Sequence, residues 1–482
     1  MPWTLSRRRV LGSFALGAVG AYLTACAAPA SPTATPAPAQ AGAPAPTTAA
    51  PAQAPAPTSA PAAAAPATKA RDKVTLRVWH WDSFLTEPYE KVGVEFAKKF
   101  PYATVTVENT PAGEYPQKVT ASVAGGAPPD LIGVTVTRAD FLTFASKGQL
   151  IPVINYVKRD NYDLSDFYDL NLKQHSWKGT LFNLPYAWNT MTWYYHEERF
   201  QQAGEPNPTA LWKEGKWNWD NYRRLAAKFT TGSGLDKYFG SGTFRPDQPP
   251  IFLPLAWSNG ADIYDAQVTK TTLTEPATME AMQFVYDLKR YMPGPEDTKT
   301  GTQESGRLAM WPNWDVHYVL MRDTTNFRYG IVPPPASTKS GKHFFIGNAP
   351  GFGIPKGAKY ADDSWELLKF ILTPEMLVIP FLEGNNTPPR KSMVANRDIW
   401  KKQTKYWDAD AMLEVAKAKE QFARNPAKIS NFAQINTAFT EEMTLVWADK
   451  QSLQDGVKKV TERVDKLLKE AEVDPDNGGI GA

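Results

Sequence analysis

The chain has 482 residues, with 53 Lys and Arg against 50 Asp and Glu, and this small formal charge of +3 argues against a nucleic-acid partner, which needs clustered basic excess. Its single cysteine excludes an intrachain disulfide framework, a cysteine-rich zinc site and a paired-cysteine redox centre. The length predicts two or three domains. The 41 prolines and 16 tryptophans divide the chain into two very different regions.

Residues 1–25 have the features of an export signal. The arginines at 7–9 form a basic start, and the apolar stretch 12–23 is too short to span a membrane comfortably. The sequence Leu23-Thr24-Ala25-Cys26 resembles the lipobox of bacterial lipoproteins, which implies that Cys26 is lipidated and anchors the chain to a membrane. The arginine pair resembles a twin-arginine signal; an ordinary basic start for the general export route is the alternative.

Residues 26–71 are predicted to form a disordered tether behind the anchor. Residues 27–70 consist almost entirely of Ala, Pro, Thr, Ser and Gln, so they have no large apolar side chains to bury and cannot offset the entropy of ordering. Regularly spaced prolines favour extended polyproline II over helix. Such a segment would hold a soluble domain away from the membrane surface.

The globular part begins near residue 72 and alternates strands with helices. Strands are expected at 74–79, 104–107 and 130–136, where apolar residues alternate or run together. Helices are expected from Pro88, with Val92, Phe96 and Phe100 on one face, from Tyr115 to the glycines at 125 and 126, and over 138–147. This β-α-β-α-β-α order predicts an α/β lobe with a parallel sheet and right-handed crossovers.

The chain after residue 151 becomes more helical and richer in aromatic residues. Extended chain is expected over 181–195 and a further strand over 327–332. Helices are expected at 219–229, 276–292, 361–372, 432–447 and 453–468.

The sequence contains none of the common catalytic motifs. It has no phosphate-binding loop, nucleophile elbow or zinc-binding HExxH helix, and its histidines at 80, 175, 196, 317 and 343 never fall at metal-ligand spacing. We therefore expect no enzymatic activity, no cofactor and no metal. Two alternatives stay open. Tyr194-Tyr195 could belong to an iron site. The chain could also be a glycosidase, because the two catalytic carboxylates of such an enzyme are brought together by the fold and leave no motif in the sequence.

The tryptophans suggest a carbohydrate site. Trp81, Trp188, Trp257 and Trp314 are among seven that fall at expected strand ends or loops, and each is followed by or lies close to a short polar side chain. A pyranose stacks its apolar C–H face on a large ring, while its hydroxyls need fixed donors and acceptors. Most individual tryptophans pack in a protein core, and we assign the ones at 365, 400, 407 and 447 to core or interhelix packing.

Several segments, in order, resemble extracellular solute-binding proteins of bacterial ABC importers, in the large group that holds the maltose-type carbohydrate-binding proteins. The resemblance covers essentially all of 72–482. It rests on LRVWHWD at 76–82, GAPPD at 126–130, FASKGQLIP at 144–152, GTLFNLP at 179–185, GRLAM at 306–310 with the tryptophan at 314, and PPR at 388–390.

The resemblance implies the type II periplasmic-binding-protein fold, with two α/β lobes, a hinge and a central ligand cleft that closes by hinge bending. It places lobe one at 72–187 and 329–385, and lobe two at 188–328 and 386–482. The expected form is a monomer, partnered by a carbohydrate, by ABC permease subunits and, through its anchor, by the extracytoplasmic face of the cell membrane.

The resemblance also implies the ligand-binding residues. They are Trp81, Asp82, Thr137, Arg138, Trp188, Asn189, Trp257, Asn259 and Trp314. Other members often carry a carboxylate where Thr137 stands and a Glu where Asn189 stands, so maltose itself is not the expected ligand. The alternatives are a phosphorylated polyol, a polyamine or iron within the same class, and an exported polysaccharide-degrading lipoprotein outside it.

Overall fold

The computed structural model describes residues 72–138, 140–297, 299–322, 324–384, 387–403 and 408–474, without the side chains of Arg138 and Leu320. These residues belong to one compact unit, Lys69–Ala482. The predicted export signal, Cys26, the tether and Trp407 lie outside the described residues.

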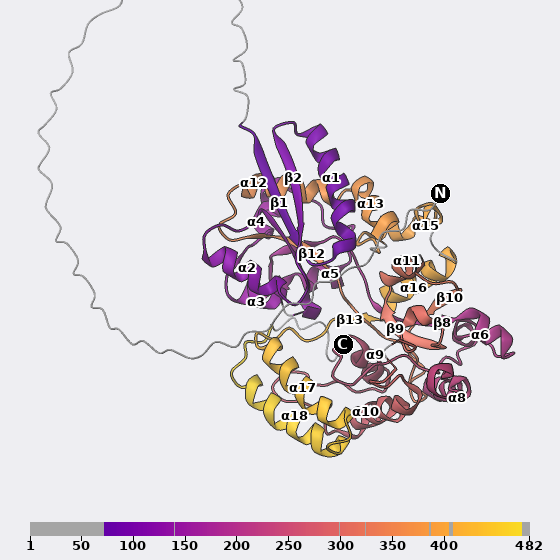
Figure 1. Ribbon diagram of the computed structural model, residues 1–482. Helices are drawn as coiled ribbons and strands as arrows, with labels where there is room; N and C mark the ends of the chain where they lie inside the picture. The colour runs from indigo at the N-terminus through magenta and orange to yellow at the C-terminus, as the bar shows by residue number, and fades with distance from the viewer. Residues whose placement is uncertain are drawn as a thin grey trace, which may run out of the picture. The chain divides into compact units, whose positions relative to one another are not determined.

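The first lobe is built on a six-stranded sheet (Figure 1). β1 (Val74–His80) pairs in parallel with β2 (Ala103–Asn109) and with β3 (Leu131–Val134), as predicted. The order is β2-β1-β3-β12-β4, in which β12 (Gly351–Pro355) runs antiparallel to β3, to β4 (Leu150–Ile151) and to β7 (Asn183–Pro185). The chain therefore returns to this sheet after a long excursion through the second lobe.

Helices cover the first sheet, and the longer ones present an apolar stripe to it. They are α1 (Thr86–Lys99), α2 (Tyr115–Ala124), α3 (Asp140–Ser146), α4 (Ile154–Asp160), α5 (Asp169–Gln174), α12 (Ala361–Ile371) and α13 (Pro374–Gly384), with the small β5 (Ser176–Trp177) and β6 (Thr180–Leu181) pair beside them. On α1, Val92 and Phe96 are buried at the i, i+4 spacing seen in the sequence.

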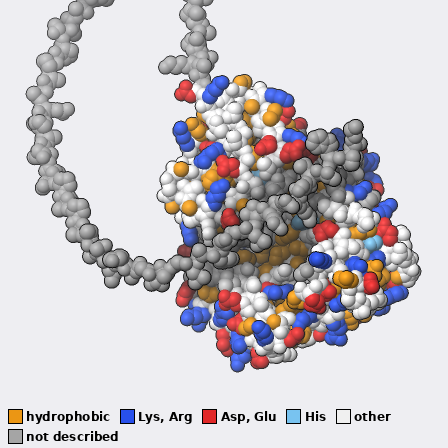
Figure 2. All heavy atoms as spheres, in the orientation of Figure 1, with side chains coloured by type: hydrophobic (Ala, Val, Ile, Leu, Met, Phe, Trp, Pro, Cys, Tyr) orange, Lys and Arg blue, Asp and Glu red, His pale blue; other side chains and the backbone are white. Residues whose placement is uncertain are grey.

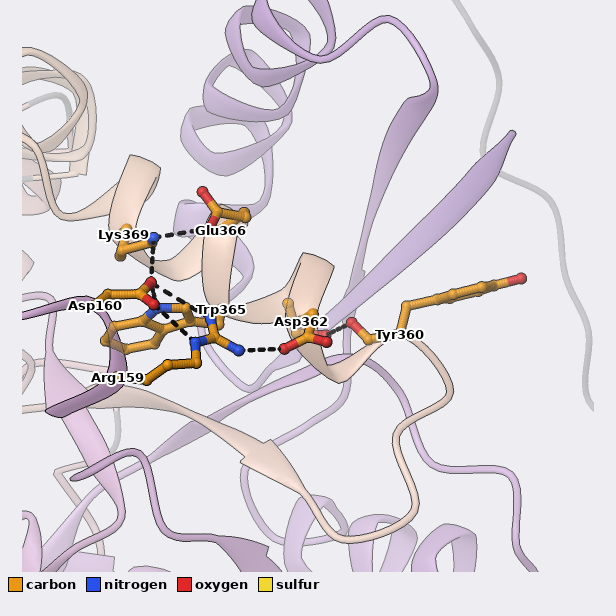
Figure 3. Close-up of polar contacts among 8 residues, drawn as sticks. Arg159, Asp160, Tyr360, Asp362, Trp365, Glu366 and Lys369 are labelled. Carbon is orange, nitrogen blue, oxygen red and sulfur yellow. Dashed lines mark hydrogen bonds and ion pairs between the residues drawn. The ribbon is translucent and has the colours of Figure 1, made fainter. Parts of the chain in front are cut away.

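A polar network on the lobe's outer side joins α4 to α12 (Figure 3). Asp160 accepts hydrogen bonds from Trp365 Nε1 and Lys369 Nζ, each at 2.7 Å, and pairs with Arg159. Arg159 also reaches Asp362. The network fixes one first-lobe helix against the segment that returns from the second lobe.

The second lobe has a three-stranded antiparallel sheet of order β10-β8-β9, with β8 (Met191–His196), β9 (Met310–Trp314) and β10 (Tyr329–Val332). Its helices are α6 (Glu197–Gln202), α7 (Pro208–Lys213), α8 (Trp219–Phe229), α9 (Pro249–Ser258), α10 (Pro276–Leu288), α11 (His317–Arg322), α14 (Lys391–Ala395), α15 (Arg397–Lys402), α16 (Ala409–Phe422), α17 (Phe432–Trp447) and α18 (Leu453–Leu468). β11 (Phe345–Ile346) and β13 (Ala423–Arg424) form a short parallel pair.

Most predicted elements are confirmed, and the helices 219–229, 432–447 and 453–468 match to the residue. The helix expected over 276–292 ends at Leu288 and continues as the 3₁₀ turn Lys289–Tyr291. α9 was not expected: eight of its residues are buried and it has no polar stripe, so it lacks helical periodicity. Trp257 therefore lies on a helix, and its assignment to a loop or strand end is wrong.

One predicted lobe boundary is also wrong. The strand that begins at residue 329 pairs with β8 of the second lobe, so the return to the first sheet comes at β12, some twenty residues later. The first crossing lies between β7 and β8, near the predicted boundary at 187. A β-bridge joins Asn189, in this crossing, to Asn348, in the returning segment.

The end of the described chain is pinned to the first lobe. Lys428 and Asp474 form an ion pair of 2.7 Å with side chains 2% and 0% exposed. Lys428 Nζ also donates to the carbonyls of Lys173 and Ser176, and Asp474 accepts from the amide of Lys178. The helices that precede Asp474, α17 and α18, bury their apolar faces in the second-lobe core.

The surface in Figure 2 carries positive and negative side chains interspersed, which agrees with the near balance of charge in the sequence. Across the described residues, no helix is both long and apolar enough to cross a membrane. The same residues contain no group of three or more His, Cys, Asp or Glu that could hold a metal ion.

Candidate functional site

A cavity of about 290 Å³ lies where the ends of first-lobe strands face the second lobe. Such edges of α/β sheets are the usual position of ligand sites. First-lobe, crossing and second-lobe residues all contribute to its walls. They are Trp81, Asp82, Phe84, Thr135, Thr137, Asn189, Pro250, Trp314, Val316, His317, Asn348 and Pro350.

The first-lobe wall is formed by residues that directly follow β1. The Trp81 ring meets the Tyr115 ring edge to face, with centroids 5.5 Å apart. A Cβ at Gly133 would come within 2.9 Å of Trp81 Cζ3, so the glycine makes room for the indole. The Tyr115 hydroxyl donates to the carbonyls of Trp79 and Gly133, which ties α2 to β1 and β3. Trp81 is thus half-buried against a fixed support.

The second-lobe wall is formed by the end of β9 and the start of α11. The Trp314 amide donates to Asn313 Oδ1 at 2.8 Å, and the Tyr194 hydroxyl donates to the Trp314 carbonyl at 2.9 Å. Burial lowers the pKa of His317, against the opposing pull of nearby Asp315. The imidazole is therefore neutral at pH 7, and a neutral imidazole has one donor and one acceptor nitrogen.

The floor is formed by the crossing segments. Asn189 and Asn348 exchange backbone hydrogen bonds of 2.9 and 3.2 Å, and Asn189 Oδ1 accepts from the Thr387 amide at 3.3 Å. Asn348 Oδ1 accepts from the hydroxyls of Thr135 and Thr137. The floor therefore joins both crossings to the loop after β3.

A buried ion pair supports the floor from behind. Lys419 Nζ lies 2.9 Å from Asp315 Oδ2, with side chains 1% and 2% exposed, and also donates to the Trp188 carbonyl. Asp315 accepts further hydrogen bonds from the Thr190 amide and the Thr387 hydroxyl. Burial lowers the pKa of Lys419, while the adjacent Asp315 carboxylate acts in the opposite direction.

Of the residues expected to bind ligand, the structure brings five together around this cavity. They are Trp81, Asp82, Thr137, Asn189 and Trp314. The backbone of Arg138 ends the 3₁₀ turn after β3, and its side chain lies outside the description.

Three residues that were expected to bind ligand do not line the cavity, so the prediction is wrong for them. Trp188 is 1% exposed, packs on the Tyr168 ring at 4.3 Å and belongs to an aromatic core cluster. Trp257 is buried within α9, where its indole nitrogen donates to Asp262 at 2.7 Å. Asn259 ends α9, with its amide nitrogen bonded to the Ala277 carbonyl and its oxygen to Ser337. The Trp188 ring is therefore packed into the core, and the side-chain polar groups of Trp257 and Asn259 are bonded within the fold.

The two tyrosines considered for an iron site, Tyr194 and Tyr195, also have their hydroxyls hydrogen-bonded within the fold. Both side chains are buried, and neither lines the cavity. The Tyr194 hydroxyl bonds the backbone at Trp314, and the Tyr195 hydroxyl bonds Thr209. The tryptophans at 365 and 400 are core residues, as expected.

Sequence reasoning missed seven cavity residues: Phe84, Thr135, Pro250, Val316, His317, Asn348 and Pro350. Thr135 directly follows the third strand, and that position alone could have marked it. Asn348 and His317 carry no comparable local pattern, because other segments bring them to the site.

Residues 91–406 match the family model described as bacterial extracellular solute-binding protein. An arabinooligosaccharide-binding protein of Bacillus subtilis is 22% identical over 310 residues, which cover 61% of this chain and 68% of that one. An sn-glycerol-3-phosphate-binding periplasmic protein of Pectobacterium atrosepticum is 24% identical over 390 residues, covering 75% and 84%.

The fold is similar to those of solved structures. An ABC substrate-binding protein of Listeria monocytogenes, solved in complex with cycloalternan, superimposes with a TM-score of 0.72 at 19% identity. The match covers 83% of this chain and all of that one. At this identity the likeness establishes the two-lobed fold.

Proposed function

The chain belongs to the bacterial extracellular solute-binding proteins, and from that premise we propose that it captures a sugar or oligosaccharide between its lobes and delivers it to an ABC import permease. The observation that carries the proposal is the meeting of Trp81 and Trp314, from different lobes, at one cavity whose remaining lining mixes apolar and polar side chains. Rings of this kind stack on the C–H faces of sugars, and fixed polar groups between them bind hydroxyls.

The charges around the cavity favour a neutral ligand over a phosphate or a polyamine. Among the described side chains that line it, Asp82 is the single carboxylate and there is no Lys or Arg. A polyol phosphate is best held by cationic or backbone N–H donors, and a polyamine by several carboxylates. The glycerol-phosphate-binding relative keeps the polyol phosphate as the second candidate.

Closure of the lobes follows from where the two rings lie. A ligand that contacts Trp81 in one lobe and Trp314 in the other makes both contacts only when the lobes approach, so binding shifts the population toward the closed form. The closed form is then the state that docks on the permease.

A thermal-shift screen of the purified full chain tests the ligand class, because a ligand that binds only the folded state raises the unfolding midpoint by mass action. The panel contains glucose, mannose, galactose, xylose, arabinose, arabinotriose, maltose and cellobiose, with glycerol 3-phosphate, putrescine and ferric citrate as comparators. We expect a sugar to give the largest shift. A shift confined to one of the comparators would contradict the proposal.

We further propose that Cys26 carries a lipid anchor and that residues 26–71 tether the binding unit to the extracytoplasmic membrane face. Expression in a bacterial host, followed by membrane fractionation, compares the chain with its Cys26→Ala variant. The variant should leave the membrane fraction. Incubation of the full chain with the oligosaccharides of the panel addresses the alternative of a degrading enzyme, for which products would appear.

A further inference from the structure

In the side-chain amide of Asn348, the oxygen is hydrogen-bonded to described residues of the fold and the nitrogen is not. Its Oδ1 accepts hydrogen bonds from Thr135 Oγ1 at 2.5 Å and from Thr137 Oγ1 at 3.0 Å. A carboxamide oxygen has two lone pairs, so these two hydroxyls satisfy it. The amide plane is thereby held in one orientation.

The other half of the amide makes no hydrogen bond to the described residues. Both side-chain bonds of Asn348 to these residues go to Oδ1 and none to Nδ2, although the side chain lines the cavity. The nitrogen carries two N–H donors. Because Oδ1 faces the loop after β3, these donors are left for whatever occupies the cavity.

The groups that hold Asn348 are themselves fixed. The backbone amide of Thr135 donates to Asp140 Oδ1 at 3.0 Å, and Thr135 and Asp140 are 2% and 1% exposed. The backbone of Asn348 is paired with Asn189 in both directions. A donor held by such a buried framework loses little conformational freedom when it binds, which is the physical basis of pre-organised recognition.

We propose that Asn348 is a specificity-determining residue, whose pre-organised carboxamide donates its two N–H groups to oxygen atoms of a neutral polyhydroxylated ligand. This assignment rests on the proposed function. A site built to pair with a ligand hydroxyl rejects an analogue without it, because its own polar group is then left unpaired. The cavity therefore selects ligands with an acceptor oxygen facing Asn348. This selection is added to the general preference for sugars that stacking on the aromatic rings gives.

The substitution Asn348→Asp separates donation from structure. Aspartate keeps an oxygen for Thr135 and Thr137, but when ionised it has no N–H to offer the ligand. Titration calorimetry with the tightest-binding sugar of the panel should show about tenfold or greater loss of affinity at pH 7. As the pH falls toward about 4, the carboxyl gains a proton and can donate again, so the variant should recover part of its affinity relative to the unsubstituted chain.

Asn218→Asp is the matched control, because Asn218 is not among the cavity-lining residues and its Oδ1 accepts from the backbone amide of Asn221, a bond that a carboxylate keeps. It should not show the pH-dependent recovery. Deoxy analogues of the bound sugar add a second measurement: for the analogue that lacks the paired hydroxyl, the Asn348→Asp variant and the unsubstituted chain should bind equally.

Equal affinity of Asn348→Asp and the unsubstituted chain for every sugar at pH 7 would overturn the assignment while leaving the proposed function intact. A loss that is the same at pH 7 and pH 4 would also overturn it, since a merely structural role predicts that result. Binding of glycerol 3-phosphate or putrescine alone would overturn both.

Discussion

The carboxylate of Asp315 and the ammonium of Lys419 lie 2.9 Å apart behind the ligand cavity, and both side chains are almost completely buried. Their hydrogen bonds reach the Trp188 carbonyl, the Thr190 amide and the Thr387 hydroxyl. The pair thus holds together four distant parts of the chain, around residues 188–190, 315, 387 and 419, at the point where the lobes join.

Replacing one partner should be strongly destabilising, because it leaves the other charge buried without compensation. We expect Lys419→Met to lower the free energy of unfolding by about 3–5 kcal/mol. Urea denaturation followed by tryptophan fluorescence measures this. Lys213→Met, in a largely exposed pair with Glu414, is the control and should change stability by less than about 1 kcal/mol. Similar small losses in both variants would contradict the role of the buried pair.

Removal of either cavity tryptophan should weaken sugar binding. Trp81→Ala and Trp314→Ala each remove a stacking surface, and we expect about tenfold or greater loss of affinity by calorimetry. Trp447→Ala, which removes a half-buried tryptophan that is not among the cavity-lining residues, should bind as the unsubstituted chain does. Unchanged affinity in Trp314→Ala would show that the cavity is not the ligand site.

Gly133 offers a test of how the Trp81 ring is positioned. A methyl group there would lie 2.9 Å from Trp81 Cζ3 and 3.2 Å from His80 Cβ, so Gly133→Ala should displace the indole. We expect a stability loss of about 1–3 kcal/mol together with weaker sugar binding. Gly113→Ala, whose Cβ meets no atom within 4 Å, should change neither quantity. Sugar affinity that survives in Gly133→Ala would mean that the ring position is unimportant.

The network of Asp160 predicts a dependence of stability on pH. Hydrogen bonds from Arg159, Lys369 and Trp365 hold the pKa of this carboxyl well below its usual range. Its stabilising contribution is therefore complete above the unfolded-state pKa of about 3.9 and is lost as the pH falls below that value. Because the group is near the surface, we expect at most about 1 kcal/mol.

Urea unfolding of the chain and of Asp160→Asn over pH 7 to pH 2 measures this contribution. The difference between the two should be constant down to about pH 4 and shrink below it. A difference that grows on acidification would contradict the direction of the pKa shift.

Long amphipathic helices were predictable because their apolar residues recur at helical spacing. α18 matches its predicted span for this reason, with Val457, Val460 and Val464 on one stripe. α9 was not predictable in the same way: a helix buried on all sides has no polar face to reveal its period, and its internal Pro254 argues against helix. The tryptophan on it was therefore misplaced.

The site was predictable where residues directly follow a strand of a recognisable motif, as Trp81 and Asp82 do. It was not predictable where distant segments meet. Thr135 and Asn348 share a hydrogen bond across 213 residues, and no local pattern in the sequence connects them. The polar framework of the cavity floor is a product of tertiary packing.

The buried pair of Lys428 and Asp474 has a practical consequence for anyone who shortens this protein. α18, the last helix among the described residues, ends at Leu468, and a recombinant version trimmed there would lack Asp474. Removing Asp474 would strand the Lys428 ammonium inside the molecule, at a cost of about 3–5 kcal/mol. The residues that follow α18 up to Asp474 fasten this end of the second lobe to the first, so an affinity tag belongs after Asp474 and not in place of these residues.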